Sequence, residues 1–356
     1  MSKYGVAIIG CGNIAGPYAD DLRTYEEIAL LGVTDVDAAR AKAFAEKYSI
    51  KAYENLDALL ADQEVQIVVN LTSHFAHHEV NTKALNAGKH VFSEKPMAVE
   101  TAEALAQVEL AKAKGLRLAC APFTLMGEAQ QTAWKYIRDG KLGPVRVAYA
   151  EVNWGRIEAW HPAPGPFYEV GALFDVGVYP LTILTSMFGP VKRVSSYGTL
   201  LYPNRITKEG VPFSIRTPDW VVTILETESD AVIRLTTDFY VSNQTSRQTG
   251  IEFHGDAGSL FLESWHDFDC KVHYAEFGKS FQEIPHIRTA SRGVPRGRGT
   301  YELVRAIIED RPHRFSGEHA WHVVDILNSA VTSMKENRPV DVTSRFDVPT
   351  PMEWAD

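Results

Sequence analysis

The sequence predicts an α/β protein with two domains, the first built on a parallel sheet and the second on a large, mostly antiparallel sheet. Over the first 122 residues, short apolar runs alternate with longer amphipathic stretches, as they do in βαβ units. After Pro122 the pattern changes to longer alternating runs joined by turn-forming residues. A chain of 356 residues, 45% of them apolar, is also long enough for two domains. We therefore predict one domain over 1–122 and a second over 123–356.

Five strands and four helices are predicted to alternate in the N-terminal domain. The first strand runs into a glycine turn, and an amphipathic stretch of helical length separates each later strand from the one before it. Parallel strands need such crossovers, so the alternation favours a parallel sheet covered on both faces. The predicted strands are 6–9, 28–33, 65–71, 90–93 and 116–120, and the predicted helices are 13–24, 37–48, 74–87 and 99–114.

The C-terminal domain is predicted to hold several sheet strands framed by helices. Alternating runs joined by turn signals such as Ser229-Asp230 are typical of antiparallel strands. The predicted strands are 145–153, 191–200, 220–228, 231–238, 251–255 and 260–263, and the predicted helices lie near 127–138, 301–310 and 318–335.

Charge and cysteine content exclude several classes of protein. A net charge of −9 gives no general attraction to nucleic acid or to an anionic membrane. Three cysteines without a C-x-x-C pair predict neither a disulfide framework nor a zinc site, and no metal is expected. The first strand begins close to Met1 and no apolar run approaches about 20 residues, so neither a signal peptide nor a membrane span is expected. The predicted location is the cytoplasm.

A glycine-rich turn follows the first predicted strand and indicates a dinucleotide site. In the GCGNIA segment, Gly10 permits a tight turn, Gly12 lets backbone approach a pyrophosphate, and Ala15 allows close helix packing. The second strand ends near Asp35, a carboxylate placed to accept hydrogen bonds from ribose hydroxyls. Because that carboxylate would repel a 2′-phosphate, NAD is favoured over NADP. A glycine turn without a ligand is the less favoured alternative.

Two further strand ends carry polar side chains at the edge of the sheet where open α/β folds bind ligands. One places Thr72 and Ser73 just after Asn70, with His77 in the following helix. For the nearby His74 and His78, surface positions are the favoured interpretation. The other ends in Glu94-Lys95-Pro96, where the proline favours an extended or turn conformation at the lysine. The candidate cofactor-binding residues are thus Gly10, Gly12, Asn13, Ile14, Asp35, Thr72, Ser73, His77, Glu94 and Lys95.

Lys95 is also a candidate catalytic residue. Although a single lysine is usually a solvated charge, a cation at this edge would stabilise a developing alkoxide and favour ionisation of a neighbouring acid. In the segment GALFDVGVYPLTIL, Asp175 and Tyr179 are four residues apart and would share one helix face. Pro180 fits the first turn of a helix that starts near 177 but would kink one that starts near 172. A capping aspartate with a core tyrosine and a catalytic pair both remain open.

The loop NWGRIEAWHPAPGPFYEVG, 153–171, is a candidate substrate site. It is rich in aromatic and hydrogen-bonding side chains and is interrupted by proline and glycine. Trp160 would stack on a sugar ring, while Arg156 and His161 would bind hydroxyl groups. The alternative is an ordinary surface loop.

Taken in order, these segments resemble the glucose-fructose oxidoreductase / inositol dehydrogenase / rhizopine catabolism (Gfo/Idh/MocA) family. The resemblance is carried by GCGNIA, the strand end at Asp35, AGKHVFSEKP and LFDVGVYP, and it extends to DGKLGPV and RPHRFSGEHAWHVVDIL. It implies a Rossmann domain followed by an α/β domain whose open sheet commonly forms the interface of a homodimer or homotetramer. It also implies an NAD(P)-dependent oxidoreductase that acts on a hydroxyl or carbonyl of a sugar, cyclitol or related polyol.

The same resemblance assigns catalytic residues one by one. Lys95 matches the family's EKP lysine, Asp175 its aspartate and Tyr179 its acid/base position, which is histidine in many members and tyrosine in others. The family's Gly-Gly-Gly before the aspartate is reduced to Gly171, which departs from the pattern. The resulting hypothesis is that Tyr179 removes the hydroxyl proton while hydride passes to NAD, with Asp175 orienting the substrate or Lys95. Lys95 as the proton acceptor, with Tyr179 as a binding group, is the alternative.

Two other functions stay open for a chain with this resemblance. One is a glycoside hydrolase that uses tightly held NAD without net oxidation. The other is a non-catalytic regulatory protein that binds NAD, against which the presence of Lys95, Asp175 and Tyr179 argues.

Overall fold

The structure is a computed structural model that describes residues 3–242, 244, 249–291 and 293–356. The chain forms two compact units, and each is described by itself. The first contains Met1–Phe123 and Pro295–Val324, and the second contains Thr124–Val294 and Asp325–Asp356. The predicted division into functional domains at residue 122 stays a prediction.

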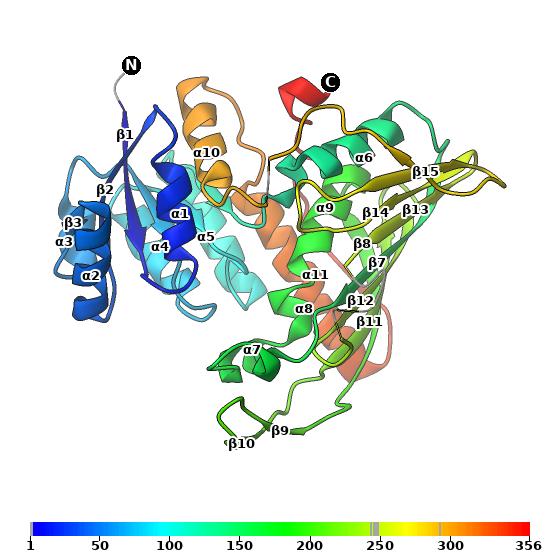
Figure 1. Ribbon diagram of the computed structural model, residues 1–356, viewed down its shortest axis with the longest axis horizontal. Coiled ribbons are helices and arrows are strands. Elements are labelled where there is room, and N and C mark those ends of the chain that lie inside the picture. The colour runs from blue at the N-terminus through cyan, green and yellow to red at the C-terminus, as the bar shows by residue number, and fades with distance from the viewer. Residues whose placement is uncertain (1–2, 243, 245–248, 292) are drawn as a thin grey trace. The chain divides into compact units, whose positions relative to one another are not determined.

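A six-stranded parallel sheet forms the centre of the first unit, in the order β3-β2-β1-β4-β5-β6 (Figure 1). The order reverses between β1 and β4, which is where open α/β sheets bind their ligands, at the carboxyl ends of the strands. All five predicted strands and all four predicted helices of this part are present, and the sequence missed only the short β3 and α3. The elements are β1 (Tyr4–Ile9), α1 (Ala15–Leu22), β2 (Ile28–Thr34), α2 (Ala38–Tyr48), β3 (Lys51–Ala52), α3 (Leu56–Ala61), β4 (Ile67–Asn70), α4 (His77–Asn86), β5 (His90–Ser93), α5 (Thr101–Ala113) and β6 (Leu118–Cys120).

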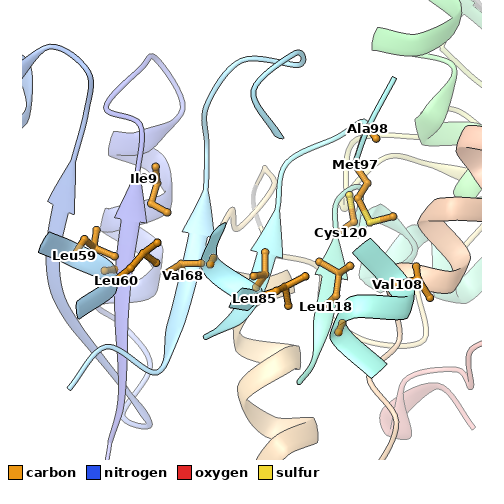
Figure 2. Packing of buried hydrophobic residues seen from close by; sticks show 14 of the residues in the cluster. Ile9, Leu59, Leu60, Val68, Leu85, Met97, Ala98, Val108, Leu118 and Cys120 are labelled. Carbon is orange, nitrogen blue, oxygen red and sulfur yellow. The ribbon is translucent and has the colours of Figure 1, made fainter. Parts of the chain in front are cut away.

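Apolar side chains from the sheet and its helices form one buried cluster on a face of this sheet (Figure 2). Figure 2 shows Ile9 and Val68 on neighbouring strands, with Leu85 and Val108 from the covering helices. Strands β1, β4 and β5 read as continuous apolar runs because both of their faces are buried. Burial of these side chains therefore holds β1 and β4 side by side, at the point where the strand order reverses.

A helix from late in the chain, α10 (Arg298–Ile308), packs beside α1 in the first unit (Figure 1). The backbone N–H of Gly297 donates to the Asp21 carboxylate at 2.7 Å, and the Tyr25 and Tyr301 rings stack with their centroids 4.1 Å apart. A side chain at Gly299 would come within 2.6 Å of the Phe92 ring, so glycine is required for this close packing. After most of the second unit, the chain thus returns to the first unit and adds α10 to its six-stranded parallel sheet.

The second unit is built on a nine-stranded sheet in the order β16-β15-β14-β13-β7-β12-β11-β8-β17. Every neighbouring pair is antiparallel except β7 and β12, which run parallel. The mostly antiparallel sheet is confirmed, whereas the sequence missed β15, the two edge strands β16 and β17, and a separate hairpin, β9–β10. The strands are β7 (Val145–Asn153), β8 (Val191–Thr199), β9 (Asn204–Ile206), β10 (Pro212–Ser214), β11 (Trp220–Thr227), β12 (Val232–Asp238), β13 (Ile251–Gly255), β14 (Gly258–Leu262), β15 (Val272–Glu276), β16 (Gln282–Ile284) and β17 (Val340–Asp341).

Helices pack on one face of the nine-stranded sheet, and the other face carries exposed side chains. The Phe188 ring on α9 lies 6.0 Å from Phe253 on β13, and Ser333 on α11 accepts a hydrogen bond from the Ser196 N–H on β8. Helix α11 begins in the first unit and continues in the second. The helical segments are η1 (Thr124–Met126), α6 (Glu128–Arg138), η2 (Ile157–Ala159), α7 (Gly165–Val170), α8 (Ala172–Asp175), α9 (Val178–Phe188), α11 (Gly317–Glu336) and η3 (Glu353–Ala355). In the described part of the chain, every helix is too short or too polar to span a membrane.

Candidate functional site

The turn after β1 contains two glycines, and the structure explains the presence of glycine differently at each position. Gly10 has a φ of 98°, and a side chain there would come within 2.8 Å of the Leu71 carbonyl oxygen, so the fold itself requires glycine. Gly12 has no such constraint, because a side chain there would meet nothing within 4 Å among the described residues. The open space above Gly12 is where a ligand's phosphates would meet bare backbone.

The Asp35 carboxylate, just beyond the end of β2, holds this turn in place. Its Oδ2 accepts a hydrogen bond from the Cys11 N–H at 2.6 Å, and its Oδ1 accepts one from the Asp37 N–H at 2.8 Å. Asp37 in turn caps α2 by accepting from the Arg40 N–H at 3.1 Å. Burial and the Asp35 charge raise the pKa of the Cys11 thiol to about 12, so the thiol is neutral.

The residues of this edge fit a dinucleotide. Within the described residues no side chain caps the start of α1, so the positive end of this helix is available to an anion. Gly12 and Asn13 are exposed there, and Ile14 is half-buried. Asp35 has acceptor capacity for ribose hydroxyls beside the same turn. The residues present therefore fit a dinucleotide, and the cofactor-binding residues named from the sequence stay a prediction.

His77 connects the two other strand ends that the sequence singled out. Its ring is buried, with Nδ1 at 2.7 Å from the Pro96 carbonyl oxygen and Nε2 at 3.1 Å from that of Thr72. Burial lowers the pKa of His77 to about 4, so the ring is neutral and donates one N–H. In this arrangement His77 contacts the backbone of both loops, whereas Thr72 is half-buried and Ser73 is exposed to solvent.

Glu94 and Lys95 lie at the end of β5 and are held from within the same unit. The Tyr18 hydroxyl donates to Glu94 Oε1 at 2.6 Å, and the Lys95 N–H donates to Glu94 Oε2 at 3.2 Å. Glu94 is buried and Lys95 is half-buried. The Glu94 carboxylate therefore orients the backbone that carries Lys95, and Asn70 organises the neighbouring loop by accepting from the Thr72 hydroxyl at 2.7 Å.

In the second unit, Asp175 and Tyr179 lie on two successive short helices. Asp175 ends α8 and is buried, while Tyr179 is the second residue of α9. The residue before α9 is Gly177, so Pro180 falls in the first helical turn, where a proline is tolerated. Of the two starts considered for this helix, the one near 177 is correct, and Asp175 is not its N-cap.

Tyr179 packs against an aromatic surface that the sequence analysis did not identify. Its ring centroid lies 4.8 Å from that of Trp265 and 5.7 Å from that of His266. Trp265 is buried and donates from Nε1 to the Glu151 carbonyl oxygen at 3.2 Å, and its ring also lies 5.6 Å from Trp154. Only the position of the SWHDF segment directly after a predicted strand pointed towards this role.

The predicted substrate loop separates into two aromatic groups. The rings of Trp160, His161 and Phe167 contact one another edge to face, and Trp160 is exposed. Arg156 lies elsewhere, with its guanidinium carbon 4.6 Å from the Tyr202 ring centroid and 5.1 Å from that of Tyr240. The structure thus associates Arg156 with two tyrosines from distant segments and not with Trp160.

A buried ion cluster, which the sequence did not reveal, lies at the base of this loop. The Arg205 side chain is fully buried and pairs with Glu158 at 2.8 Å and with Asp219 at 2.7 Å. Tyr168 donates its hydroxyl to Glu158, and burial next to that carboxylate raises the pKa of the tyrosine. In the part of the chain that the structure describes, no group of three or more His, Cys, Asp or Glu side chains is arranged to hold a metal ion.

Two family models match the chain, one over each of its sheets. The model described as the oxidoreductase family with an NAD-binding Rossmann fold matches residues 4–121. A second, for the GFO/IDH/MocA C-terminal domain, matches residues 130–261, and the two together span more than half of the chain. The chain belongs to the Gfo/Idh/MocA family. The resemblance noted in the sequence is therefore confirmed, as is its Rossmann fold.

Individual members of the Gfo/Idh/MocA family are similar to this chain over different lengths. A trans-1,2-dihydrobenzene-1,2-diol dehydrogenase of Macaca fuscata fuscata is 33% identical over 189 residues, which are 52% of this chain and 56% of the relative. The human enzyme of that name is 32% identical over 188 residues. The chain thus spans about half the length of the curated relatives it matches.

Solved structures of low identity share the fold over nearly the whole chain. An NAD binding oxidoreductase from Klebsiella pneumoniae has a TM-score of 0.86 at 20% identity and covers 96% of this chain and 100% of its own. A levoglucosan dehydrogenase in complex with NADH and L-sorbose has a TM-score of 0.84 at 18% identity, with 97% and 100% covered. These likenesses establish the two-sheet architecture.

Proposed function

We propose that this protein is an NAD-dependent dehydrogenase that transfers hydride between the cofactor and a hydroxyl or carbonyl carbon of a sugar, cyclitol or related polyol. The observation that carries the proposal is the turn at the end of β1. There, open space above Gly12, the uncapped start of α1 and the Asp35 carboxylate supply the three features that a dinucleotide needs. The dihydrodiol dehydrogenases among the relatives support oxidation at a CH–OH group.

NAD is the proposed cofactor, in preference to NADP. The Asp35 carboxylate accepts two backbone hydrogen bonds, which fix its position where the adenosine ribose would lie. A 2′-phosphate would be repelled by it. Arg40 lies 3.8 Å from Asp35 and partly offsets that repulsion, which makes the pair Asp35–Arg40 the determinant to test.

The proposed catalytic residues are Tyr179, Lys95 and Asp175. When bound, NAD supplies the hydride acceptor. Tyr179, in its phenolate form, takes the hydroxyl proton at its phenolic oxygen, Lys95 stabilises the negative charge that develops on the substrate oxygen, and Asp175 orients the substrate or Lys95. The helix start at Gly177 supports this role for Tyr179, because its side chain projects from the first turn of α9 and packs on Trp265. Lys95 as the proton acceptor stays the alternative.

The test is the appearance of NADH absorbance with monosaccharides, inositols, anhydrosugars and vicinal diols, in parallel with NAD and NADP. We expect turnover with NAD that is lost in Tyr179→Phe and Lys95→Ala, while both variants still bind NADH. A pH profile of hydroxyl oxidation separates the two assignments, because the residue that accepts the proton must be deprotonated and therefore sets the acidic limb. Release of sugar from glycosides without NADH would support the hydrolase alternative, and cofactor binding without any reaction would support a regulatory protein.

A homo-oligomer formed through the nine-stranded sheet is part of this proposal. The face opposite the helices carries exposed aromatic and aliphatic side chains on neighbouring strands, which favours association with a second copy. These side chains are Tyr149, Tyr197, Ile224 and Val232. Sedimentation of the wild type and of Ile224→Lys would test it, with a smaller species expected for the variant.

A cytoplasmic location is proposed on the state of the thiols. Cys11, Cys120 and Cys270 are all free, as is usual in a reducing compartment. Fractionation of cells that produce the protein at natural levels would test this.

A further inference from the structure

We infer that the natural substrate carries a carboxylate and that Arg156 binds it, so that the substrate class is a sugar acid or polyol acid. The inference rests on the proposed dehydrogenase function and makes its substrate more specific. It goes beyond the hydroxyl-binding role that the sequence suggested for Arg156.

The first observation is the environment of the Arg156 guanidinium. It lies over the faces of two tyrosine rings, with its central carbon 4.6 Å from Tyr202 and 5.1 Å from Tyr240. Among the residues that the structure describes, no carboxylate forms an ion pair with it. Arg156 is exposed, and Tyr202 and Tyr240 are 41% and 38% exposed, so the group faces solvent. Stacking covers the faces of a guanidinium and leaves the N–H groups at its edge available to a planar anion.

The two tyrosines are held by buried carboxylates. Asp219 accepts from the backbone N–H groups of Leu201 at 2.6 Å and of Tyr202 at 3.0 Å. Asp238 accepts from the backbone N–H groups of Tyr240 at 2.9 Å and of Val241 at 2.7 Å. Because both carboxylates are fully buried, each tyrosine is fixed at its backbone before any ligand arrives.

Arg156 itself is fixed through the residues that follow it. The Ile157 N–H donates to the Tyr168 hydroxyl at 3.1 Å, and Glu158 pairs with the buried Arg205. Arg205 also pairs with Asp219, the same carboxylate that holds Tyr202. One buried cluster therefore sets both the turn that carries Arg156 and one of the rings against which it stacks.

The acidic side chains of this region contact groups other than Arg156. Glu158 and Asp219 are paired with Arg205, and Asp238 accepts two backbone N–H groups at its Oδ1. These three acidic side chains therefore stabilise the fold of the region, and the Arg156 guanidinium is exposed to solvent. A rigid guanidinium without its own carboxylate is the group that proteins use for bidentate binding of carboxylates.

A continuous series of rings connects this group to the proposed acid/base residue within the second unit. Tyr179 contacts Trp265, and Trp265 contacts Trp154, which precedes Arg156 by two residues. The Trp154 N–H donates to the carbonyl oxygen of Asp238 at 3.1 Å, so the strand end that holds Tyr240 also holds Trp154. Trp265 is buried, so these rings form a support beneath Tyr179 and Trp154, and a substrate whose hydroxyl reaches Tyr179 would bring its carboxylate to Arg156 above that support.

The experiment compares acids with neutral compounds of the same carbon skeleton: D-glucuronate with D-glucose, and D-gluconate with D-glucitol. The enzymes are the wild type, Arg156→Gln and Arg156→Lys, with Arg146→Gln as a control that removes one exposed arginine at the other end of β7. We expect the wild type to favour at least one acid over its neutral partner. In Arg156→Gln, kcat/KM for that acid falls about 10- to 100-fold, mainly through KM, and the preference disappears. Arg156→Lys recovers only part of it, and Arg146→Gln behaves as the wild type.

Other outcomes overturn the inference, and they are distinct from failure of the proposed function. If the neutral sugars are oxidised and the acids are not, or if Arg156→Gln lowers both rates equally, the dehydrogenase stands and the carboxylate site is wrong. If no compound yields NADH, calorimetric titration of each acid in the presence of NADH tests the carboxylate site independently of the reaction. If an acid binds to the wild type and not to Arg156→Gln, the carboxylate site is supported even though the proposed reaction is not. If no acid binds to the wild type, the carboxylate site is rejected.

Discussion

The Asp35 carboxylate accepts a hydrogen bond of 2.6 Å from the backbone N–H of Cys11 and so ties the end of β2 to the glycine turn after β1. One carboxylate thereby shapes the turn and, in the function proposed above, would also present an acceptor to the adenosine ribose. Arg40 lies near two carboxylates, 3.8 Å from Asp35 and 3.5 Å from Asp37.

Replacement of Asp35 should change the cofactor preference. In Asp35→Ser the repulsion of a 2′-phosphate is removed and Arg40 loses one of its two carboxylate neighbours, so kcat/KM for NAD falls and that for NADP rises, which shifts their ratio by about 100-fold. Asp37→Asn is the comparison variant, because it keeps a capping side chain on α2 but removes the other carboxylate near Arg40, and so separates the effect of Arg40 from that of Asp35. Steady-state rates with both cofactors measure the effect, and an unchanged ratio would contradict the role of Asp35.

The two turn glycines should respond differently to alanine. Gly10→Ala is expected to lose about 1–3 kcal/mol of unfolding free energy, since it combines an unfavourable φ with a contact against the Leu71 carbonyl. Gly12→Ala should unfold at nearly the same denaturant concentration as the wild type but bind NADH at least about 10-fold more weakly. Urea unfolding and fluorescence titration together separate the effects, and equal destabilisation by both changes would be evidence against the open space above Gly12.

His77 is expected to act through the backbone it holds. In His77→Leu the carbonyls of Thr72 and Pro96 lose the ring N–H that one of them accepts, with a cost of about 1–3 kcal/mol in stability. The loop positions then relax, so the KM for NAD should rise. His77→Gln restores one donor and should recover part of both losses. His78→Leu, on the same helix but outside this pair of contacts, should leave the KM unchanged.

Trp265 is expected to position Tyr179. In Trp265→Leu the ring 4.8 Å from Tyr179 is removed, so kcat should fall about 10-fold while NADH affinity stays the same, because the change lies in the second unit. Trp265→Phe keeps an aromatic surface and should retain more activity. Pre-steady-state hydride transfer measures this directly, and a loss confined to cofactor binding would disprove the assignment.

Asp238 should make stability depend on pH. Burial raises its pKa to about 6, above the value near 4 of an unfolded chain, so the folded state holds the proton longer. Between these values the wild type loses stability as pH rises. Asp238→Asn cannot titrate, and its stability relative to the wild type should therefore increase by about 2 kcal/mol between about pH 4 and pH 7. Asp256→Asn, at an exposed carboxyl whose pKa is lowered by Arg146, should show no such increase.

The sequence predicted those strands, helices and turns that are marked by a pattern within a few neighbouring residues. Periodicity located the five main strands of the first sheet, and the turn and strand-end residues located the candidate cofactor edge. Short edge strands such as β3 and β16 carry too few residues for a periodic signal. Trp265, Arg205 and Tyr240 could not be assigned from the sequence, because each acquires its role from contacts with residues far away in the chain.

The close packing of Gly299 against Phe92 has a consequence for protein engineering. The first unit consists of two separate segments of the chain, so a fragment that stops at Phe123 would lack α10. The rings of Phe92 and Phe123, which pack against Gly299, would then be exposed to solvent and would promote aggregation. A chimaera designed to exchange substrate specificity between relatives should therefore transplant 124–294 together with 325–356 and keep 295–324 from the parent of the Rossmann sheet. A chimaera with a single crossover at residue 123 would take 295–324 from a different parent than the sheet against which this segment packs.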